Sequence, residues 1–144
     1  NCPFVITHSR GNSQNMNFLL DYKNLTNDII SNLKELTDKA LKKKINEKNI
    51  IWDPGLGFSK NTEQNITILK NIEKFKGQGF PLLIGASRKR FIGELLNINN
   101  PKERDVGSLA ISCFCSQYKI DIVRVHNVKL NRQILNVSDA INRY

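Results

Sequence analysis

Four short apolar runs divide the chain, and each is followed by apolar residues at helical spacing. The runs cover residues 3–7, 49–52, 81–85 and 120–125, and each is too short to form a helix of ordinary length. Short runs that are mainly apolar are typical of strands that are buried on both faces of a sheet. The pattern therefore predicts four buried strands.

The segments between and after these runs carry one-sided apolar patterns. In the first segment, apolar residues recur every three or four positions: Leu25, Ile29, Leu33, Leu36 and Ala40. Asn61 is placed to cap the second helix, and Gln64 follows three residues later, as in a capping box. A short helix is predicted over residues 87–96, and two further apolar faces predict helices over 106–117 and 130–141.

Strands that alternate with helices predict a parallel sheet in an α/β fold. One such architecture is a flavodoxin-like open sheet, which suits a chain of 144 residues. The other is four consecutive units of a (β/α)8 TIM barrel, a fold whose usual length is about 250 residues. Length alone favours the open sheet.

Composition limits the function classes. With 40% hydrophobic and 24% charged residues, the chain fits one globular domain, and no apolar run approaches the ~20 residues of a membrane span. The formal charge is +9, but Asn, Lys and Ile are so frequent that a solvated lysine-rich surface explains it better than a nucleic-acid interface. Three cysteines at irregular spacing predict a reducing, cytoplasmic location, with an organelle left open. Because no leader is visible and Met16 is the only methionine, we expect a piece of a longer protein.

Polar residues gather where each predicted strand ends. The sequences there are T-H-S-R-G from Thr7, D-P-G-L-G-F-S-K from Asp53, G-A-S-R-K-R-F from Gly85 and R-V-H-N from Arg124. Because the carboxyl ends of parallel strands face the same way, these four loops predict one shared site. Asp53 ends a buried strand, so its carboxylate needs a cation or paired N–H donors.

Cations dominate the two later loops. Ser87 is predicted to cap a helix whose first turn holds three cations, an unfavourable position next to the helix dipole unless an anion binds there. Arg124 and His126 are two residues apart on a strand, which places both side chains on one side as a phosphate-binding pair. Asp53 could instead form an internal ion pair with Lys89 or Arg124, and His8 is expected to be structural. The residues alone predict a site for a phosphorylated nitrogen heterocycle.

In this order, the motifs H-x-x-G from His8, D-P-G-x-G-F-x-K from Asp53, G-x-S-R-K from Gly85 and R-V-H-[ND]-V from Arg124 resemble dihydropteroate synthase. The resemblance covers the whole chain. It implies a TIM barrel of which residues 1–144 are the C-terminal half, containing the last four βα units, in place of the open sheet that length favours.

The resemblance also implies the reaction and its ligands. In this family, 4-aminobenzoate displaces pyrophosphate from a hydroxymethyl-dihydropterin pyrophosphate, giving dihydropteroate for folate synthesis. By matching positions, the pterin-binding residues are Asp53, Lys89 and Arg124. Arg124 and His126 match pyrophosphate-binding residues, and no side chain is expected to act as an acid or base. Phe58 and Ser87 match the aminobenzoate pocket; Arg90 stands where relatives often have Ser or Thr, so its role there stays open.

The first four barrel units are absent from this sequence. The family's Mg²⁺ ligand belongs to that half, so no metal ligand is expected here, and the chain alone is expected to be inactive. The resemblance further implies a homodimer and leaves open fusion to a pyrophosphokinase domain, as in some protists and fungi. The biased composition would suit a malaria-type parasite.

Three alternatives are weaker. A pterin-binding methyltransferase shares the requirement for Asp53 but needs no pyrophosphate site. A nucleic-acid-binding module would need cations on one outer face, interleaved with aromatic residues. A flavodoxin-like flavin protein would bind a coloured cofactor.

Overall fold

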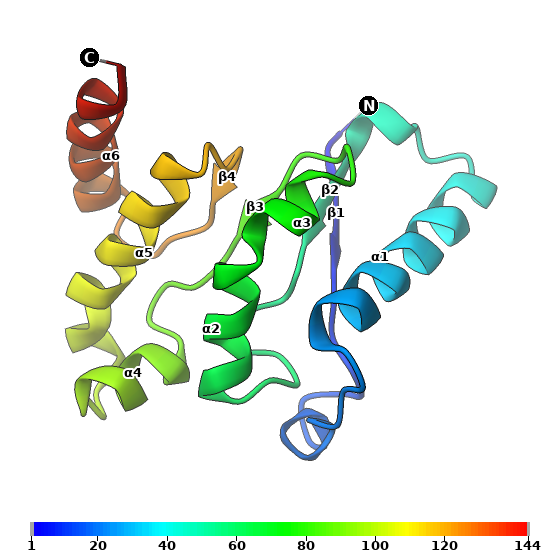
Figure 1. Cartoon of the computed structure of the whole chain (residues 1–144), viewed down its shortest axis with the longest axis horizontal. Coiled ribbons are helices and arrows are strands. Elements are labelled where there is room, and N and C mark those ends of the chain that lie inside the picture. Colours follow the sequence, from blue (N-terminus) through cyan, green and yellow to red (C-terminus); the bar gives the residue numbers. More distant parts are fainter. Residues whose placement is uncertain (1, 144) are drawn as a thin grey trace.

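The computed structural model describes residues 2–143. Within these residues there are four strands, as the apolar pattern predicted, and each is followed by one or two α-helices; the six helices are one more than predicted (Figure 1). The strands are β1 (Phe4–Thr7), β2 (Ile50–Asp53), β3 (Leu83–Ile84) and β4 (Ile122–Val123). The helices are α1 (Leu25–Lys42), α2 (Thr62–Lys70), α3 (Ile72–Lys76), α4 (Arg90–Leu96), α5 (Asp105–Gln117) and α6 (Val128–Arg143). Short 3-10 turns are η1 (Met16–Phe18), η2 (Glu47–Asn49) and η3 (Pro101–Arg104).

All observed strand pairings are parallel and follow chain order. β1 pairs with β2, with Ile6 opposite Trp52, and β3 pairs with β4. A parallel bridge between Trp52 and Leu82 joins the two pairs, so the strand order is β1-β2-β3-β4. Figure 1 shows the helices following one another along this sheet, from α1 at the right to α6 at the left. This is the arrangement of consecutive units in a βα barrel.

The core lies between the sheet and its helices and centres on Trp52, which is fully buried. The indole Nε1 donates a hydrogen bond to Thr37 Oγ1 on α1 at 2.9 Å, and the ring stacks on Phe80 with a centroid separation of 4.8 Å. The inward face of α1 adds Ile29 and Leu33, both with no exposed surface. The predicted stripe is therefore the face that packs on the sheet.

The structure corrects several predicted boundaries. The capping box of α2 is confirmed: the Asn61 side chain accepts from the Gln64 N–H, and the Gln64 side chain accepts from the Asn61 N–H. The helix that was predicted to continue from α2 is divided at Asn71 into α2 and α3. β4 is shorter than predicted at both ends; at its start, the Ile120 N–H bonds to Cys115 O near the end of α5 and is unavailable to the sheet.

The prediction that Ser87 caps a helix with three cations in its first turn is wrong. α4 begins at Arg90, its N-cap residue is Lys89, and Arg88 adopts a left-handed backbone with φ of 59°. The three cations therefore point in different directions: Arg88 pairs with Asp105, Lys89 lies above Phe58 and Arg90 pairs with Glu94.

No helix within residues 2–143 has the length and apolar content to cross a bilayer.

Candidate active site

Asp53 is the last residue of β2, and its carboxylate is held from two sides. Only 1% of the residue is exposed. Oδ1 accepts from the Gly55 N–H at 2.8 Å, because the turn that follows the strand folds back over the side chain. Oδ2 accepts from Arg124 Nη2 at 3.0 Å and from Thr7 Oγ1 at 3.4 Å. Of the two ion pairs considered for Asp53, the structure shows the one with Arg124.

Arg124 follows β4 and crosses the end of β3 to reach Asp53. Its path runs over Gly85, where an added Cβ would lie 2.8 Å from Arg124 Nη2, so a side chain at position 85 would require the guanidinium to shift. The Arg124 side chain is 51% exposed although its partner is buried. One end of the ion pair is thus open to a ligand that approaches from above the strands.

Lys89 lies beside the same cluster and above an aromatic ring. Its Nζ is 3.8 Å from the centroid of the Phe58 ring, within the range of a cation–π contact. Burial lowers the pKa of Lys89, and the Arg124 charge lowers it further, while the Asp53 charge opposes both. The structure therefore brings Phe58, predicted for a different ligand, into direct contact with the predicted pterin-binding lysine.

Ser87 joins the loop after β3 to the loop after β4. Its Oγ accepts from the His126 backbone N–H at 3.2 Å and lies 3.0 Å from His126 Nδ1. When the Ser87 hydroxyl donates to Nδ1, the hydrogen of the neutral ring is on Nε2. The Nε2–H group can then donate a hydrogen bond to an anion. Arg124 and His126 follow the strand rather than belong to it, yet both line one depression of about 180 Å³ together with Ser87 and Gly85.

Arg90 is directed elsewhere. It is on the exposed first turn of α4, and its Nε pairs with Glu94 of the same helix at 3.2 Å. Glu94 also accepts a hydrogen bond from Thr62 Oγ1 at the start of α2.

A buried Lys60–His8 pair was not foreseen. Lys60 Nζ lies 2.9 Å from His8 Nδ1 and donates to the carbonyls of Gly55 (3.0 Å) and Phe58 (2.9 Å). Burial lowers the pKa of Lys60 to about 7 and, together with the Lys60 charge, lowers the pKa of His8 to about 3. A neutral His8 accepts from Lys60, which confirms a structural histidine. The sequence feature that could have indicated this pair is Lys60 itself, the last residue of the D-P-G-L-G-F-S-K motif.

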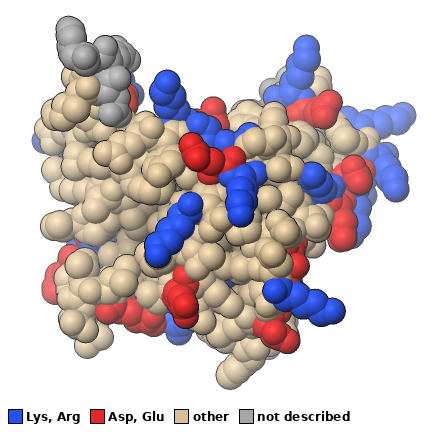
Figure 2. Space-filling model, viewed as in Figure 1, with Lys and Arg blue, Asp and Glu red and all other residues tan. Residues whose placement is uncertain are grey.

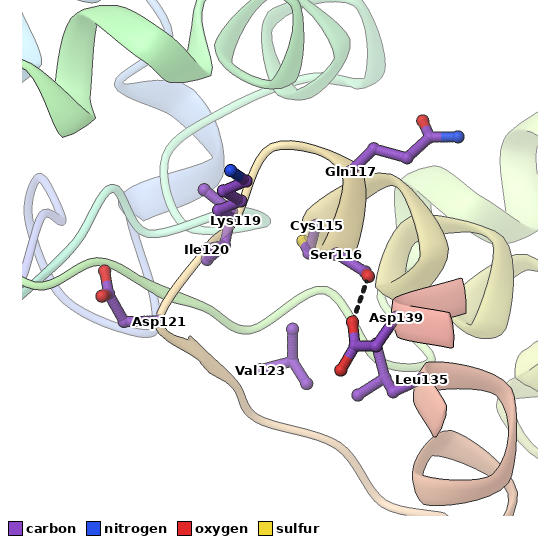
Figure 3. A pocket seen from close by; sticks show the side chains of 9 residues that line it. All are labelled: Cys115, Ser116, Gln117, Lys119, Ile120, Asp121, Val123, Leu135 and Asp139. Atoms are coloured by element: carbon purple, nitrogen blue, oxygen red, sulfur yellow. Dashed lines mark hydrogen bonds between the residues drawn. The ribbon is translucent and has the colours of Figure 1, made fainter. Parts of the chain in front are cut away.

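A larger hollow, about 590 Å³, is not part of this site. It lies beside β4 between α5 and α6, and its lining includes the charged residues Lys119, Asp121 and Asp139 (Figure 3). Asp139 is already bonded to Ser116 at 2.6 Å. Because Asp121 precedes β4, this hollow is at the amino ends of the strands, whereas the polar loops are at the carboxyl ends.

The outer surface carries mixed charge. On the face drawn in Figure 2, Lys and Arg side chains are interspersed with Asp and Glu. A nucleic-acid interface needs cations collected in one stripe or patch. This face instead has the character of a solvated lysine-rich surface.

The fold is that of consecutive βα-barrel units, with a depression lined by polar side chains at the carboxyl ends of the strands. The family described as pterin binding enzyme matches residues 1–126. The chain belongs to this family.

Individual relatives support the same family assignment. Dihydropteroate synthase of Synechocystis sp. is 43% identical over 141 residues, covering 98% of this chain and 49% of the relative. Dihydropteroate synthase of Yersinia pestis, solved in a sulfonamide complex, superposes with a TM-score of 0.94 at 30% identity, over 99% of this chain and 51% of that one. Plasmodium falciparum HPPK-DHPS, solved with pterin and p-hydroxybenzoate, gives a TM-score of 0.88 at 34% identity, over 99% of this chain and 26% of that one. The chain spans about half the length of the curated dihydropteroate synthases that it matches, and the fold is that of a partial TIM barrel.

Proposed function

We propose that residues 1–144 are the C-terminal half of a dihydropteroate synthase barrel. The observation that carries this proposal is the arrangement of Asp53, Arg124 and Lys89 within one cluster, beside a depression that Ser87 and His126 line. A buried carboxylate suits the N–H edge of a pterin, and the adjacent donors suit a pyrophosphate. A methyltransferase of the same barrel group would need the first feature and not the second.

In this proposal, Asp53 orients the pterin. Its carboxylate accepts from the 2-amino group and the neighbouring ring N–H, and the Gly55 N–H keeps Oδ1 in place. Oδ2 exchanges the Arg124 hydrogen bond for the ligand, which frees the half-exposed guanidinium to stack on the ring and reach the phosphates. Lys89 donates to the pterin from its position above Phe58.

The chemical step transfers the pterin methylene from oxygen to nitrogen. The C–O bond to pyrophosphate breaks, the amine of 4-aminobenzoate forms the new C–N bond, and the amine proton is released to water. Bond breaking leaves negative charge on the pyrophosphate, so donors fixed in advance stabilise the transition state more than a base would. Arg124 and the His126 Nε2–H supply such donors here.

The aminobenzoate pocket is proposed along Phe58 and Ser87, with Arg90 at its rim. Arg90 can bind the ligand carboxylate only by giving up its pairing with Glu94. The Yersinia pestis relative was solved with a sulfonamide and the Plasmodium falciparum relative with p-hydroxybenzoate. Both ligands are similar in shape to 4-aminobenzoate, which supports a pocket of this kind.

Other parts of the assembly are proposed on the resemblance. We propose that the Mg²⁺ ligand lies in the first half of the barrel; within residues 2–143, no group of three or more His, Cys, Asp or Glu side chains gathers to hold a metal. We also propose a cytoplasmic homodimer. The Plasmodium falciparum HPPK-DHPS makes fusion to a pyrophosphokinase a reasonable arrangement.

The deciding experiment is incorporation of labelled 4-aminobenzoate by the complete reading frame, with and without Asp53→Asn. We expect activity in the unmodified protein and a loss of about a hundredfold in kcat/KM in the variant, since a buried charge-assisted contact is removed. Asp121→Asn is the matched control, because Asp121 also accepts one backbone N–H (from Leu82, 2.8 Å) but at the other end of the sheet. Pterin binding without incorporation would favour the methyltransferase, and turnover by residues 1–144 alone would contradict the half-barrel proposal.

A further inference from the structure

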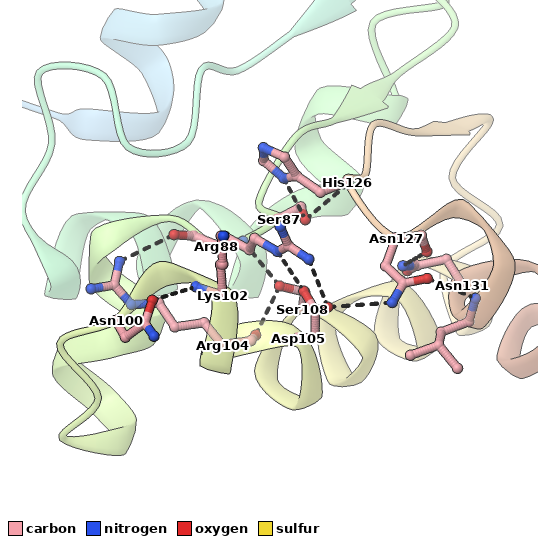
Figure 4. Close-up of polar contacts among 11 residues, drawn as sticks. Ser87, Arg88, Asn100, Lys102, Arg104, Asp105, Ser108, His126, Asn127 and Asn131 are labelled. Atoms are coloured by element: carbon pink, nitrogen blue, oxygen red, sulfur yellow. Dashed lines mark hydrogen bonds and ion pairs between the residues drawn. The ribbon is translucent and has the colours of Figure 1, made fainter.

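A second polar network supports the site without lining its depression. Arg88 forms a bidentate ion pair with Asp105, the first residue of α5: Nε to Oδ1 at 2.7 Å and Nη2 to Oδ2 at 2.9 Å (Figure 4). Planar, two-point pairing fixes the direction of the guanidinium as well as its charge. The sequence gives no local signal for this pair, because the two residues are 17 positions apart, with α4 and η3 between them.

The Arg88 backbone is held by the same part of the molecule. Its N–H donates to Ser108 Oγ at 3.0 Å, and its carbonyl accepts from Arg104 Nη1 at 3.1 Å. The residue has φ of 59°, a left-handed conformation that costs a non-glycine residue free energy. Contacts from the start of α5 to the side chain, the N–H and the carbonyl hold it there. The strained residue stands directly between Ser87 and Lys89, the two residues of this loop that face the site.

Asp105 also reaches the neighbouring loop. Its Oδ2 accepts from Asn127 Nδ2 at 3.4 Å. Asn127 follows His126 directly, and its own backbone carbonyl accepts from Asn131 Nδ2 at 2.7 Å, which ties this loop to α6. A single carboxylate therefore contacts the loop after β3 and the loop after β4.

We propose that Arg88 and Asp105 are positioning residues. They fix the Ser87–Lys89 loop relative to the Arg124–His126 loop, so that the two loops together bind the pyrophosphate. The inference rests on the proposed function. It adds two residues that touch no ligand and that act through the contacts between Ser87 and His126.

The bidentate geometry makes a specific demand. Lysine at position 88 keeps the charge but cannot form the two-point pair, so Arg88→Lys should behave like a loss of the pair. Glycine at position 88 relieves the backbone strain but loses the side-chain contact to Asp105. If the ion pair serves only to sustain the left-handed backbone, Arg88→Gly should retain anion binding.

The test measures binding of inorganic pyrophosphate to residues 1–144 by calorimetry, at a temperature where all variants are folded. The variants are Asp105→Ala, Arg88→Lys and Arg88→Gly. The control is Asp139→Ala, which removes another carboxylate that bridges α6 to α5, through Ser116, beside the hollow at the opposite ends of the strands. We expect the Kd to rise at least tenfold in all three variants, as for a displaced binding group, and to stay unchanged in the control.

A two-bond 1H–15N spectrum of the His126 ring gives a second readout. The unmodified chain should show one tautomer with hydrogen at Nε2, and Asp105→Ala should show a mixture, because Ser87 no longer stays beside Nδ1. An unchanged Kd in Asp105→Ala, or a Kd that Arg88→Gly fully retains, would overturn the proposal. If the unmodified chain does not bind pyrophosphate, the proposed anion site fails, and the ring spectrum alone decides: an unchanged spectrum in Asp105→Ala rejects positioning and a mixed one supports it.

Discussion

At the scale of single residues, buried polar side chains show which sequence motifs are structural. His8 and Lys60 are 1% and 3% exposed, and each belongs to a motif that reads equally well as a ligand-binding loop. Their contacts indicate a structural role, because Lys60 donates its hydrogen bonds to His8 and to two backbone carbonyls. Asp53, by contrast, pairs with a half-exposed arginine and stays within reach of a ligand.

This pair predicts how stability depends on pH. Burial lowers the pKa of His8 from 6.5 to about 3, so between these values the unfolded chain binds a proton that the folded chain does not. The free energy of unfolding should therefore fall as the pH is lowered from 6.5 towards 3, and the contribution of His8 should be fully present above 6.5.

Urea unfolding of the chain at a series of pH values measures this slope. In His8→Asn, the amide oxygen takes the place of Nδ1 as an acceptor for Lys60 but does not titrate, so the slope should become shallower. NMR of the His8 ring provides the check: its resonances should not move between pH 7 and 5. A ring that titrates with its ordinary pKa would contradict the prediction.

At the scale of elements, local features were predictable and features with distant causes were not. The capping box of α2 follows from Asn61 and Gln64 at the required offset, and the structure has it. Arg88 was placed inside a helix because the residues near it allow one. Its left-handed backbone is held by contacts with Asp105 and its neighbours at the start of α5, 17 residues further along the chain, which leave no local pattern.

The loop after β2 gives a prediction at this scale, because it is packed directly on the loop after β1. Gly55 has φ of +72°, and an added Cβ would lie 1.9 Å from the backbone oxygen of His8. Gly55→Ala should lower the free energy of unfolding by about 3 kcal/mol, from backbone strain and from separating the two loops.

Gly79→Ala is the matched control for this substitution. Gly79 also has a positive φ, +87°, but an added Cβ would meet nothing within 4 Å. It should lose about 1 kcal/mol, the strain alone. Equal losses in the two variants, measured by urea unfolding, would show that the contact between the loops contributes nothing.

At the scale of the whole molecule, the apolar pattern predicted the order of the βα units correctly. The chain length, however, favoured an open sheet over a barrel, which was wrong. An open sheet suits 144 residues, but the relatives of known structure are barrels about twice as long. Periodicity cannot distinguish these folds, since both consist of alternating buried strands and helices. The motifs at the strand ends made the distinction, because they resemble one family.

A half-barrel leaves strand edges that a closed barrel pairs. Among residues 2–143, β1 pairs only with β2, and the outer side of β4 adjoins the hollow between α5 and α6. Phe4 and Val5 of β1 are 42% and 37% exposed, which is unusual for apolar residues of a parallel strand. Unpaired apolar edges recruit other strands.

Residues 1–144 in isolation should therefore associate with one another through these edges. Sedimentation velocity should show a weight-average mass that rises with concentration, and Val5→Lys should reduce this rise because a charge on an edge strand opposes pairing. Leu95→Lys is the control: Leu95 is 55% exposed but belongs to α4, away from both edges. If both substitutions reduce association equally, general surface hydrophobicity is responsible. If only Val5→Lys does so, the free edge of β1 is the contact, as expected for a strand that would be paired on both sides in a closed barrel.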